Sequence, residues 1–146
     1  NKIVFTGKID EFYDFRFGKL EYRTVRFETE VLNEANHQGN AVVNYTSPEV
    51  PYTRIIEHKH FETFGNAVYD NPYTVISREY STEWYDGMEP FYPINDKKNQ
   101  TIYKQYHAIA KRESKIIFGG RLAEYKYYDM APIIAQVLIH LKNQSL

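Results

Sequence analysis

An arginine and several tyrosines have the types and the surroundings that anion binding requires. Arg54 lies at the start of an expected strand, and residues 89–93, which include Tyr92, form a rigid, proline-containing aromatic loop. Residues 125–129, with three tyrosines of which Tyr127 is one, lead into an expected helix N-terminus. An arginine fork matches phosphate oxygens, a tyrosine hydroxyl donates to the same oxygens, and a helix N-terminus favours anions. The set fits a diphosphate-bearing ligand, although on these residues alone ordinary sheet and loop packing is the favoured interpretation.

A pair of histidines raises the question of a metal site. His58 and His60 follow Glu57 in a stretch that we expect to be a strand, where residues i and i+2 share a face. No third ligand stands at a recognisable spacing. We therefore favour polar residues on a strand surface and predict no metal site.

A glycine pair followed by an arginine is the remaining pattern with chemical meaning. Gly119 and Gly120 come directly after a short apolar run and directly before Arg121. The ordinary interpretation is a tight turn after a strand, and the functional one is close approach of the backbone to a ligand. The residues alone favour the turn and leave a ligand open.

Composition excludes several classes of protein. The 146 residues fit one domain, and 18 Lys+Arg against 19 Asp+Glu lack the basic excess typical of nucleic-acid binders. No apolar run approaches the roughly 20 residues that span a bilayer, and the lack of cysteine excludes disulfides and thiolate chemistry. Fourteen tyrosines exceed nine phenylalanines, which suits a hydrogen-bonding cleft as well as a core.

Alternating and apolar runs predict the elements that position these residues. Period two over residues 20–31 predicts a half-buried strand. Shorter strands are expected, with polar or proline-containing turns between several of them, at residues 3–5, 41–45, 52–58 and 73–80. Short connections between strands favour an antiparallel meander.

The pattern changes to a helical period after Pro93. Asn95 or Asp96 can cap a helix that runs to about Glu113, and a short strand follows at residues 116–118. Asp129 can cap a last helix whose broad apolar face needs a partner. The fold class is therefore α+β, an antiparallel sheet of about five to six strands followed by helix, strand and helix.

Several longer runs resemble one family, the UDP-galactopyranose mutases. They appear in the family's order, span nearly the whole chain and together are highly specific. These runs are residues 16–23, 41–46, 51–59, 89–93 and 118–130.

The resemblance implies an isomerase that interconverts UDP-galactopyranose and UDP-galactofuranose, a precursor of cell-wall polysaccharides, with reduced FAD as the nucleophile. It implies substrate-binding roles for Asn44, Arg54, Tyr92 and Tyr127. Catalytic roles are implied for Arg54, Arg121 and Asp129. Cofactor-binding roles are implied for Gly120, Arg121, Asp129 and Met130.

The resemblance also shapes the expected organisation of the chain. The family begins with a Gly-x-Gly-x-x-Gly flavin-binding unit, which this sequence lacks, so we expect a C-terminal portion of a larger FAD-dependent α/β enzyme, inactive alone. Residues 1–94 would form the substrate-binding sheet region, and residues 95–146 would return to the flavin-binding domain. A cytoplasmic location and a homodimeric parent enzyme are expected.

Two other functions stay open at this point. A freestanding nucleotide-sugar binding module would use the same aromatic sheet without catalysis. A segment of an amine-oxidase-like flavoprotein would share only the Gly-Gly-Arg turn and the last helix. Arg54, Tyr92 and Tyr127 together favour a mutase, because the amine-oxidase chemistry needs no diphosphate clamp.

Overall fold

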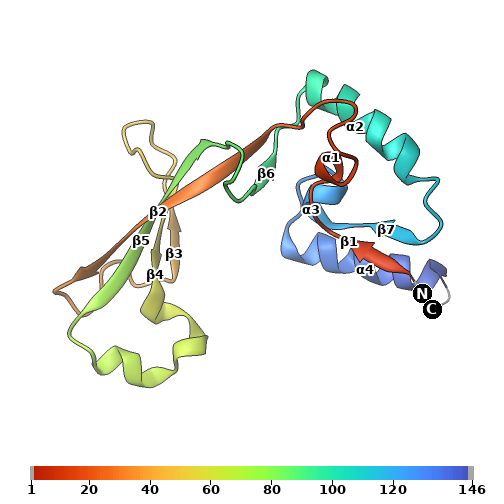
Figure 1. Ribbon diagram of the computed structural model, residues 1–146. Coiled ribbons are helices and arrows are strands. Elements are labelled where there is room, and N and C mark those ends of the chain that lie inside the picture. Colours follow the sequence, from red (N-terminus) through yellow and green to blue (C-terminus); the bar gives the residue numbers. More distant parts are fainter. Residues whose placement is uncertain (1, 145–146) are drawn as a thin grey trace. The chain divides into compact units, whose positions relative to one another are not determined.

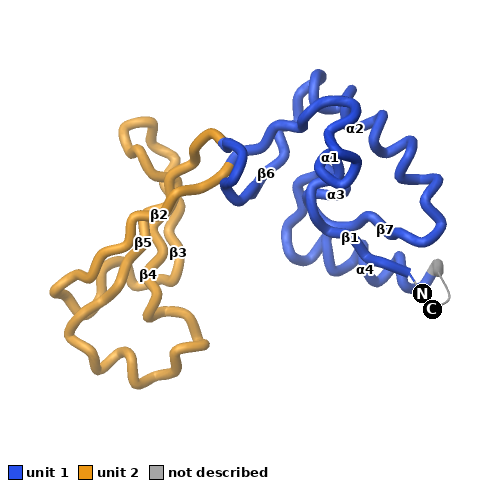
Figure 2. The backbone as a smooth tube through the Cα atoms, viewed as in Figure 1, with its two compact units in different colours: residues 1–23, 84–146 blue, residues 24–83 orange. Residues whose placement is uncertain are grey.

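The chain forms two compact units in the computed structural model, which describes residues 2–144. Unit 1 comprises Asn1–Arg23 and Trp84–Leu146, and unit 2 comprises Thr24–Glu83, so that the second unit is inserted into the sequence of the first (Figure 2). Residue 1 and residues 145–146 lie outside the described residues. The functional division between residues 94 and 95 stays a prediction, and the compact units divide the chain at other points.

Unit 2 is built on an antiparallel sheet. β3 (Val42–Asn44) pairs with β4 (Arg54–Glu57), and β4 pairs with β5 (Thr74–Glu83). β2 (Tyr22–Leu32) lies on the other side of β5, and its first two residues belong to unit 1, where they pair with β6 (Tyr92–Pro93). The strand order is β3-β4-β5-β2-β6 (Figure 1), which confirms a five-stranded sheet.

The predicted meander is correct for β3, β4 and β5 and wrong for β2. In a meander β2 would pair with β3, but its neighbour is β5. Residues 33–41 therefore connect β2 to the opposite edge of this sheet, and the backbone N–H groups of His37 and Gln38 donate there to the Glu57 carboxylate. Because this loop is held by the Glu57 side chain and not by regular structure, no periodic pattern in the sequence predicts its path.

The predicted strand over residues 52–58 ends earlier than expected. β4 stops at Glu57, and His58–His60 form a 3₁₀ turn, η1, so the two histidines do not share a strand face. Two further 3₁₀ turns follow, η2 (Glu62–Phe64) and η3 (Asn66–Asp70). Lys59 ends the strand pattern because its buried Nζ donates to the carbonyl oxygens of Ala35 and Asn71.

Unit 1 combines a parallel strand pair with helices. The predicted strands at residues 3–5 and 116–118 are confirmed, and Ile3 lies opposite Ile116 in their register. The two longer helices begin where the sequence predicts. The elements are β1 (Ile3–Phe5), β7 (Ile116–Phe118), α1 (Ile9–Phe12), α2 (Lys97–Ala110), α3 (Gly120–Ala123) and α4 (Met130–Gln144).

The core of unit 1 depends on a capped, amphipathic α2. The Asp96 carboxylate accepts a hydrogen bond from Asn99 N at 2.7 Å and caps the helix. Tyr106 is fully buried, and its hydroxyl accepts from Phe17 N at 3.0 Å and donates to Gly18 O at 2.8 Å. The buried cluster consists of Ile9, Leu20, Tyr22, Tyr106, Ala110 and Tyr125. By contrast, much of the apolar face of α4 is exposed.

Candidate functional site

The predicted site residues divide between the two units. Asn44 and Arg54 belong to unit 2. The other predicted residues belong to unit 1, and they are Tyr92, Gly120, Arg121, Tyr127, Asp129 and Met130. Within each unit the structure brings its own members close together, and each group is described by itself.

The sheet of unit 2 brings Asn44 and Arg54 together. Asn44 ends β3, Arg54 begins β4, and the two are register partners in the antiparallel ladder. A further backbone bond from Tyr45 N to Thr53 O, at 2.9 Å, extends this pairing beyond both strands. Directly opposite partners have Cβ atoms about 5 Å apart. An amide and a guanidinium therefore lie side by side on the sheet, as a polar ligand would require.

Glu79 is a site neighbour that sequence reasoning missed. It lies opposite Arg54 in the β4–β5 ladder, and its Oε1 is 3.3 Å from Arg54 Nε. Thr53 Oγ1 donates to the same Oε1 at 3.0 Å, and Thr53 N donates to Glu79 O at 2.8 Å. The Glu79 side chain is only 10% exposed, against 39% for Arg54, so a fixed carboxylate orients a more accessible guanidinium. Only the register of β5 against β4 reveals this contact.

In unit 1, Arg121 joins two segments that carry predicted tyrosines. Its Nη1 donates to Phe91 O at 3.0 Å, and its Nη2 donates to Tyr128 O at 2.6 Å. Phe91 precedes Tyr92, and Tyr128 follows Tyr127. One guanidinium thereby fixes the backbone beside both tyrosines, since charged donors make the stronger hydrogen bonds.

The two tyrosine rings form a small aromatic site around Arg121. The ring centroids of Tyr92 and Tyr127 are 5.8 Å apart at an interplanar angle of 32°. Arg121 Cζ lies 5.2 Å from the Tyr92 centroid and 4.9 Å from the Tyr127 centroid, within cation–π range. Tyr127 is 56% exposed, so its ring is open to a ligand. A cation beside two phenol rings suits an anionic or sugar-bearing ligand.

Asp129 is tied to Tyr127. The Tyr127 hydroxyl donates to Asp129 Oδ1 at 2.8 Å. This hydrogen bond, with smaller contributions from burial and from the Asp129 charge, raises the pKa of Tyr127 above its ordinary value. The phenol therefore stays protonated and can act as a donor, and the carboxylate is held at the start of α4.

The backbone around Gly119, Gly120 and Met130 is open enough for a flat cofactor. A Cβ on Gly119 would meet no atom within 4 Å, and Gly120 has a φ of +85° that glycine tolerates best. Met130 begins α4 and is 83% exposed. A fifteen-residue helix presents free N–H groups at this end. These features fit the edge of a flavin.

The two histidines have separate partners. His58 Nε2 is 2.8 Å from Ser77 Oγ, whereas His60 Nε2 is 3.1 Å from Glu57 Oε2. Among residues 2–144, no group of three or more His, Cys, Asp or Glu side chains is arranged to hold a metal ion. In the same part of the chain, no helix combines the length and the apolar character that crossing a membrane requires.

Comparison with known proteins identifies a family. A family model described as UDP-galactopyranose mutase matches residues 1–127. Over 147 aligned residues, the chain is 36% identical to the dTDP-fucopyranose mutase of Escherichia coli, covering 98% of this chain and 38% of that protein. It is 38% identical over 136 residues to a Klebsiella pneumoniae protein named "Probable UDP-galactopyranose mutase", covering 93% of this chain and 34% of that protein.

A third relative is the UDP-galactopyranose mutase of Mycoplasma pneumoniae, strain M129. The chain is 34% identical to it over 141 residues, which cover 93% of this chain and 34% of the relative. The chain thus spans about a third of the length of the curated relatives that it matches.

Proposed function

The chain belongs to the UDP-galactopyranose mutase family, and from this premise we propose that the protein carrying it interconverts UDP-galactopyranose and UDP-galactofuranose. The observation that carries the proposal is the family match over residues 1–127, which includes most of the candidate site residues. Asp129 and Met130 lie just beyond it and rest on the resemblance of residues 118–130.

Arg54, Tyr92 and Tyr127 would bind the diphosphate of the substrate. Arg54 supplies a guanidinium that Glu79 orients from the neighbouring strand, and Tyr92 supplies a hydroxyl donor. The Tyr127 hydroxyl donates to Asp129 in the structure, and its proton would turn from Asp129 to a phosphate oxygen when the substrate binds. Asn44, the register partner of Arg54, would hydrogen-bond the sugar. A diphosphate that leaves the sugar and later rejoins it must be held in place meanwhile, and fixed donors do this without reorganisation.

Gly120, Arg121, Asp129 and Met130 would hold FAD. When bound, reduced FAD would supply the nucleophile for the anomeric carbon, so that no side chain of this chain would need to play that part. Gly120 lets the backbone approach the cofactor, and the start of α4 offers N–H groups to it. Arg121 keeps the Phe91 and Tyr128 carbonyls in place, and its charge faces the two tyrosine rings.

A second substrate is supported by one observation, the 36% identity to a dTDP-fucopyranose mutase over 98% of this chain. Both sugars named for the relatives are nucleoside-diphosphate pyranoses, so the same diphosphate clamp would serve either. A non-catalytic nucleotide-sugar module is less well supported, because the matched relatives carry the names of mutases.

The experiment uses the natural protein that contains this sequence, loaded with FAD and reduced with dithionite. UDP-galactofuranose and dTDP-fucopyranose are supplied separately, and ring isomers are separated by chromatography. We expect Arg54→Ala to weaken UDP binding and to lower kcat/KM about 100-fold or more, because the charged hydrogen bonds of the guanidinium to the diphosphate would be lost. Lys104→Ala, on the exposed surface of α2, is the control that keeps full activity.

Two results would contradict the proposal. Turnover of neither nucleotide sugar by the reduced protein would exclude mutase activity towards them. Unchanged UDP affinity in Arg54→Ala would remove Arg54 from the diphosphate site while leaving the family assignment in place.

A further inference from the structure

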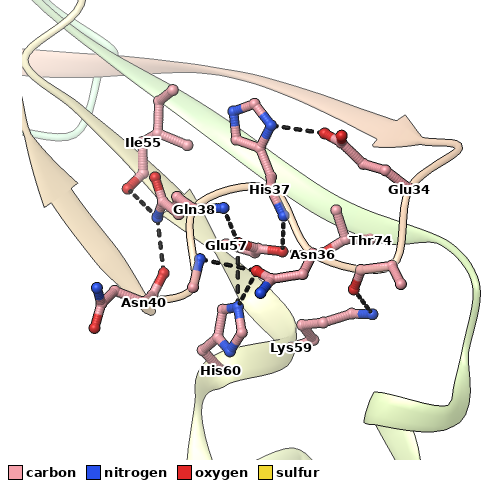
Figure 3. A network of polar contacts seen from close by, with 12 residues as sticks. Glu34, Asn36, His37, Gln38, Asn40, Ile55, Glu57, Lys59, His60 and Thr74 are labelled. Atoms are coloured by element: carbon pink, nitrogen blue, oxygen red, sulfur yellow. Dashed lines mark hydrogen bonds and ion pairs between the residues drawn. The ribbon is translucent and has the colours of Figure 1, made fainter.

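A buried carboxylate lies three residues beyond Arg54 on the same strand. Glu57 ends β4, has 0% exposure, and is surrounded by the loop of residues 33–41 (Figure 3). It contacts none of the predicted site residues directly. Burying an ionised group is costly unless hydrogen bonds compensate it, so a fully enclosed carboxylate needs a structural explanation.

Glu57 accepts from donors on three sides. Its Oε1 accepts from His37 N at 2.9 Å and from Thr74 Oγ1 at 2.7 Å, while its Oε2 accepts from Gln38 N at 2.8 Å and lies 3.1 Å from His60 Nε2. Burial by itself raises the pKa of this carboxyl, but the two backbone N–H groups, the hydroxyl and the histidine outweigh it and lower the pKa to about 2. The carboxyl group is therefore ionised at neutral pH.

These donors make Glu57 an anchor that holds the loop of residues 33–41 against the sheet. Two of them are consecutive backbone N–H groups of the loop itself, at His37 and Gln38. The Gln38 side chain adds bonds from Nε2 to Asn40 O at 2.8 Å and to Ile55 O at 3.2 Å. Figure 3 shows the loop bonds to Glu57 at the end of β4 and the bonds from Gln38 to Asn40 and Ile55 beside them.

The position of β3 depends on this loop. β3 has three residues, lies at the edge of the sheet, and pairs only with β4 in the strand order. The loop enters β3 through the bond from Glu57 N to Ala41 O, at 2.9 Å. Short edge strands are the least constrained part of a sheet. Glu57 thus fixes the entry to β3, and Asn44 fixes its exit opposite Arg54.

We propose that Glu57 is a positioning residue for substrate binding: by holding the loop of residues 33–41, it sets the register of β3 and so places Asn44 beside Arg54. This inference rests on the proposed function, because it assigns Asn44 to the sugar. Glu57 touches no reacting atom, and its effect on the substrate passes through Asn44.

Glu57→Gln is the informative variant because it keeps the size and removes the acceptor-only character. Each backbone N–H of the loop needs an acceptor, and an amide has only one oxygen, so either orientation turns its NH₂ towards one of them. Glu34→Gln is the matched control: it removes an exposed carboxylate of the same loop, whose Oε1 is 2.7 Å from His37 Nδ1. The two changes have the same chemistry and differ in whether they disturb the anchor.

Two measurements are made on the natural protein that contains this sequence. Hydrogen–deuterium exchange should show amides of residues 36–44 exchanging about tenfold faster or more in Glu57→Gln, but not in Glu34→Gln. In the reduced enzyme, kcat/KM per bound flavin should fall about 10- to 100-fold, and the rise in KM should be larger than the fall in kcat. In an Asn44→Ala background the same substitution should change kcat/KM less than about twofold, because its target is already gone.

Additive effects of Glu57→Gln and Asn44→Ala on kcat/KM would overturn the proposal. A Glu57→Gln protein that is less stable but keeps its kcat/KM would overturn it as well. If Glu57→Gln does not fold, Thr74→Val removes a single donor to Oε1 and should give the same pattern with smaller changes. If the unaltered protein turns over neither nucleotide sugar, the proposed function fails. Exchange over residues 36–44 then still decides whether Glu57 holds β3.

Discussion

The two units hold their candidate site residues by different means. In unit 2, Asn44 and Arg54 are placed by backbone ladders on neighbouring strands, and buried acidic side chains support those strands. In unit 1, Tyr92 and Tyr127 lie on segments that one guanidinium, Arg121, ties together through two carbonyl oxygens. A ladder shares its stabilisation over many bonds. Tyr92 is also held by the two-residue ladder between β2 and β6, but Tyr127 lies outside the strands, and the two charged hydrogen bonds from Arg121 join its segment to that of Tyr92. Single substitutions should therefore affect the two units very differently.

Removing the guanidinium of Arg121 should have the largest effect on stability. Arg121→Met keeps an apolar stem but loses both bonds to Phe91 O and Tyr128 O. At roughly 1.5–3 kcal/mol for each hydrogen bond to a charged group, we expect unit 1 to lose about 3 kcal/mol of unfolding free energy. Hydrogen exchange in increasing urea measures this loss separately for the amides of each unit.

Lys126→Met provides the control for this substitution. Lys126 is exposed, and its Nζ lies 5.0 Å from the Tyr128 ring centroid, so its loss removes a cation from the same segment without freeing a carbonyl. We expect less than about 0.5 kcal/mol from it. An equal loss in both variants would mean that charge, and not the bridge between segments, stabilises the tyrosine site.

Acid should weaken unit 2 through Glu57. The pKa of its carboxyl is lowered from the ordinary 4.5 to about 2. The stabilisation is therefore complete above about pH 4.5 and is lost as the pH falls towards 2, by about 3 kcal/mol at roughly 1.4 kcal/mol per pKa unit. The titratable side chain that lies against this carboxylate is His60, whose Nε2 is 3.1 Å from Oε2. Urea midpoints between pH 6 and pH 2.5, read from unit 2 amides, measure the change, and Glu57→Gln should flatten the profile.

Two substitutions that each delete one hydroxyl group should show whether a loss of unfolding free energy in one unit leaves the other unit unchanged. Tyr106→Phe leaves Phe17 N and Gly18 O without their partner in unit 1. Thr74→Val removes the donor to Glu57 Oε1 in unit 2. Each should cost about 2 kcal/mol, since both hydroxyls belong to buried side chains and their loss leaves polar groups without a partner. Calorimetry with unit-resolved exchange measures both, and equal loss in both units from either variant would contradict separate stabilisation.

Replacing Asp129 should have the smallest effect, a change in the pKa of the Tyr127 hydroxyl alone. The Tyr127 hydroxyl donates to Asp129 Oδ1, and this bond is the main cause of its raised pKa. In Asp129→Asn the pKa of Tyr127 should move down towards its ordinary value of 10.0. Titration of Cζ-labelled tyrosine by NMR follows the change. An unmoved pKa would show that burial, and not Asp129, sets it.

Sequence patterns predicted the regular elements well and the side-chain anchors poorly. The strands at residues 3–5 and 116–118 and the starts of α2 and α4 are correct, because apolar periodicity and capping residues are local signals. The end of β4 at Glu57 was missed, since Lys59 is buried by carbonyl partners that come from distant segments. Glu79 was missed for a related reason: opposing residues on paired strands carry no shared spacing.

The candidate site residues themselves came from a resemblance, and the structure adds how each is held. Arg54 was identified as an anion-binding residue, but its ion pair with Glu79 depends on strand register. Arg121 was assigned to ligand contact, whereas the structure shows donors directed at Phe91 O and Tyr128 O. Its role towards a cofactor stays a prediction. A residue type indicates what a side chain can bind, and only the fold shows what it already binds.

The parallel pairing of β1 with β7 has a consequence for how the chain is made. Ile3–Phe5 finds its partner only when Ile116–Phe118 has been synthesised, whereas the internal contacts of unit 2 need nothing beyond Glu83. On the ribosome, unit 2 can therefore finish folding while the first strand of unit 1 still waits with an unpaired edge. A nascent chain arrested shortly after residue 83 has emerged should contain a protease-resistant sheet and a protease-sensitive N-terminal segment. Unit 2 can thus complete its fold before unit 1, although the first strand of unit 1 is synthesised earlier.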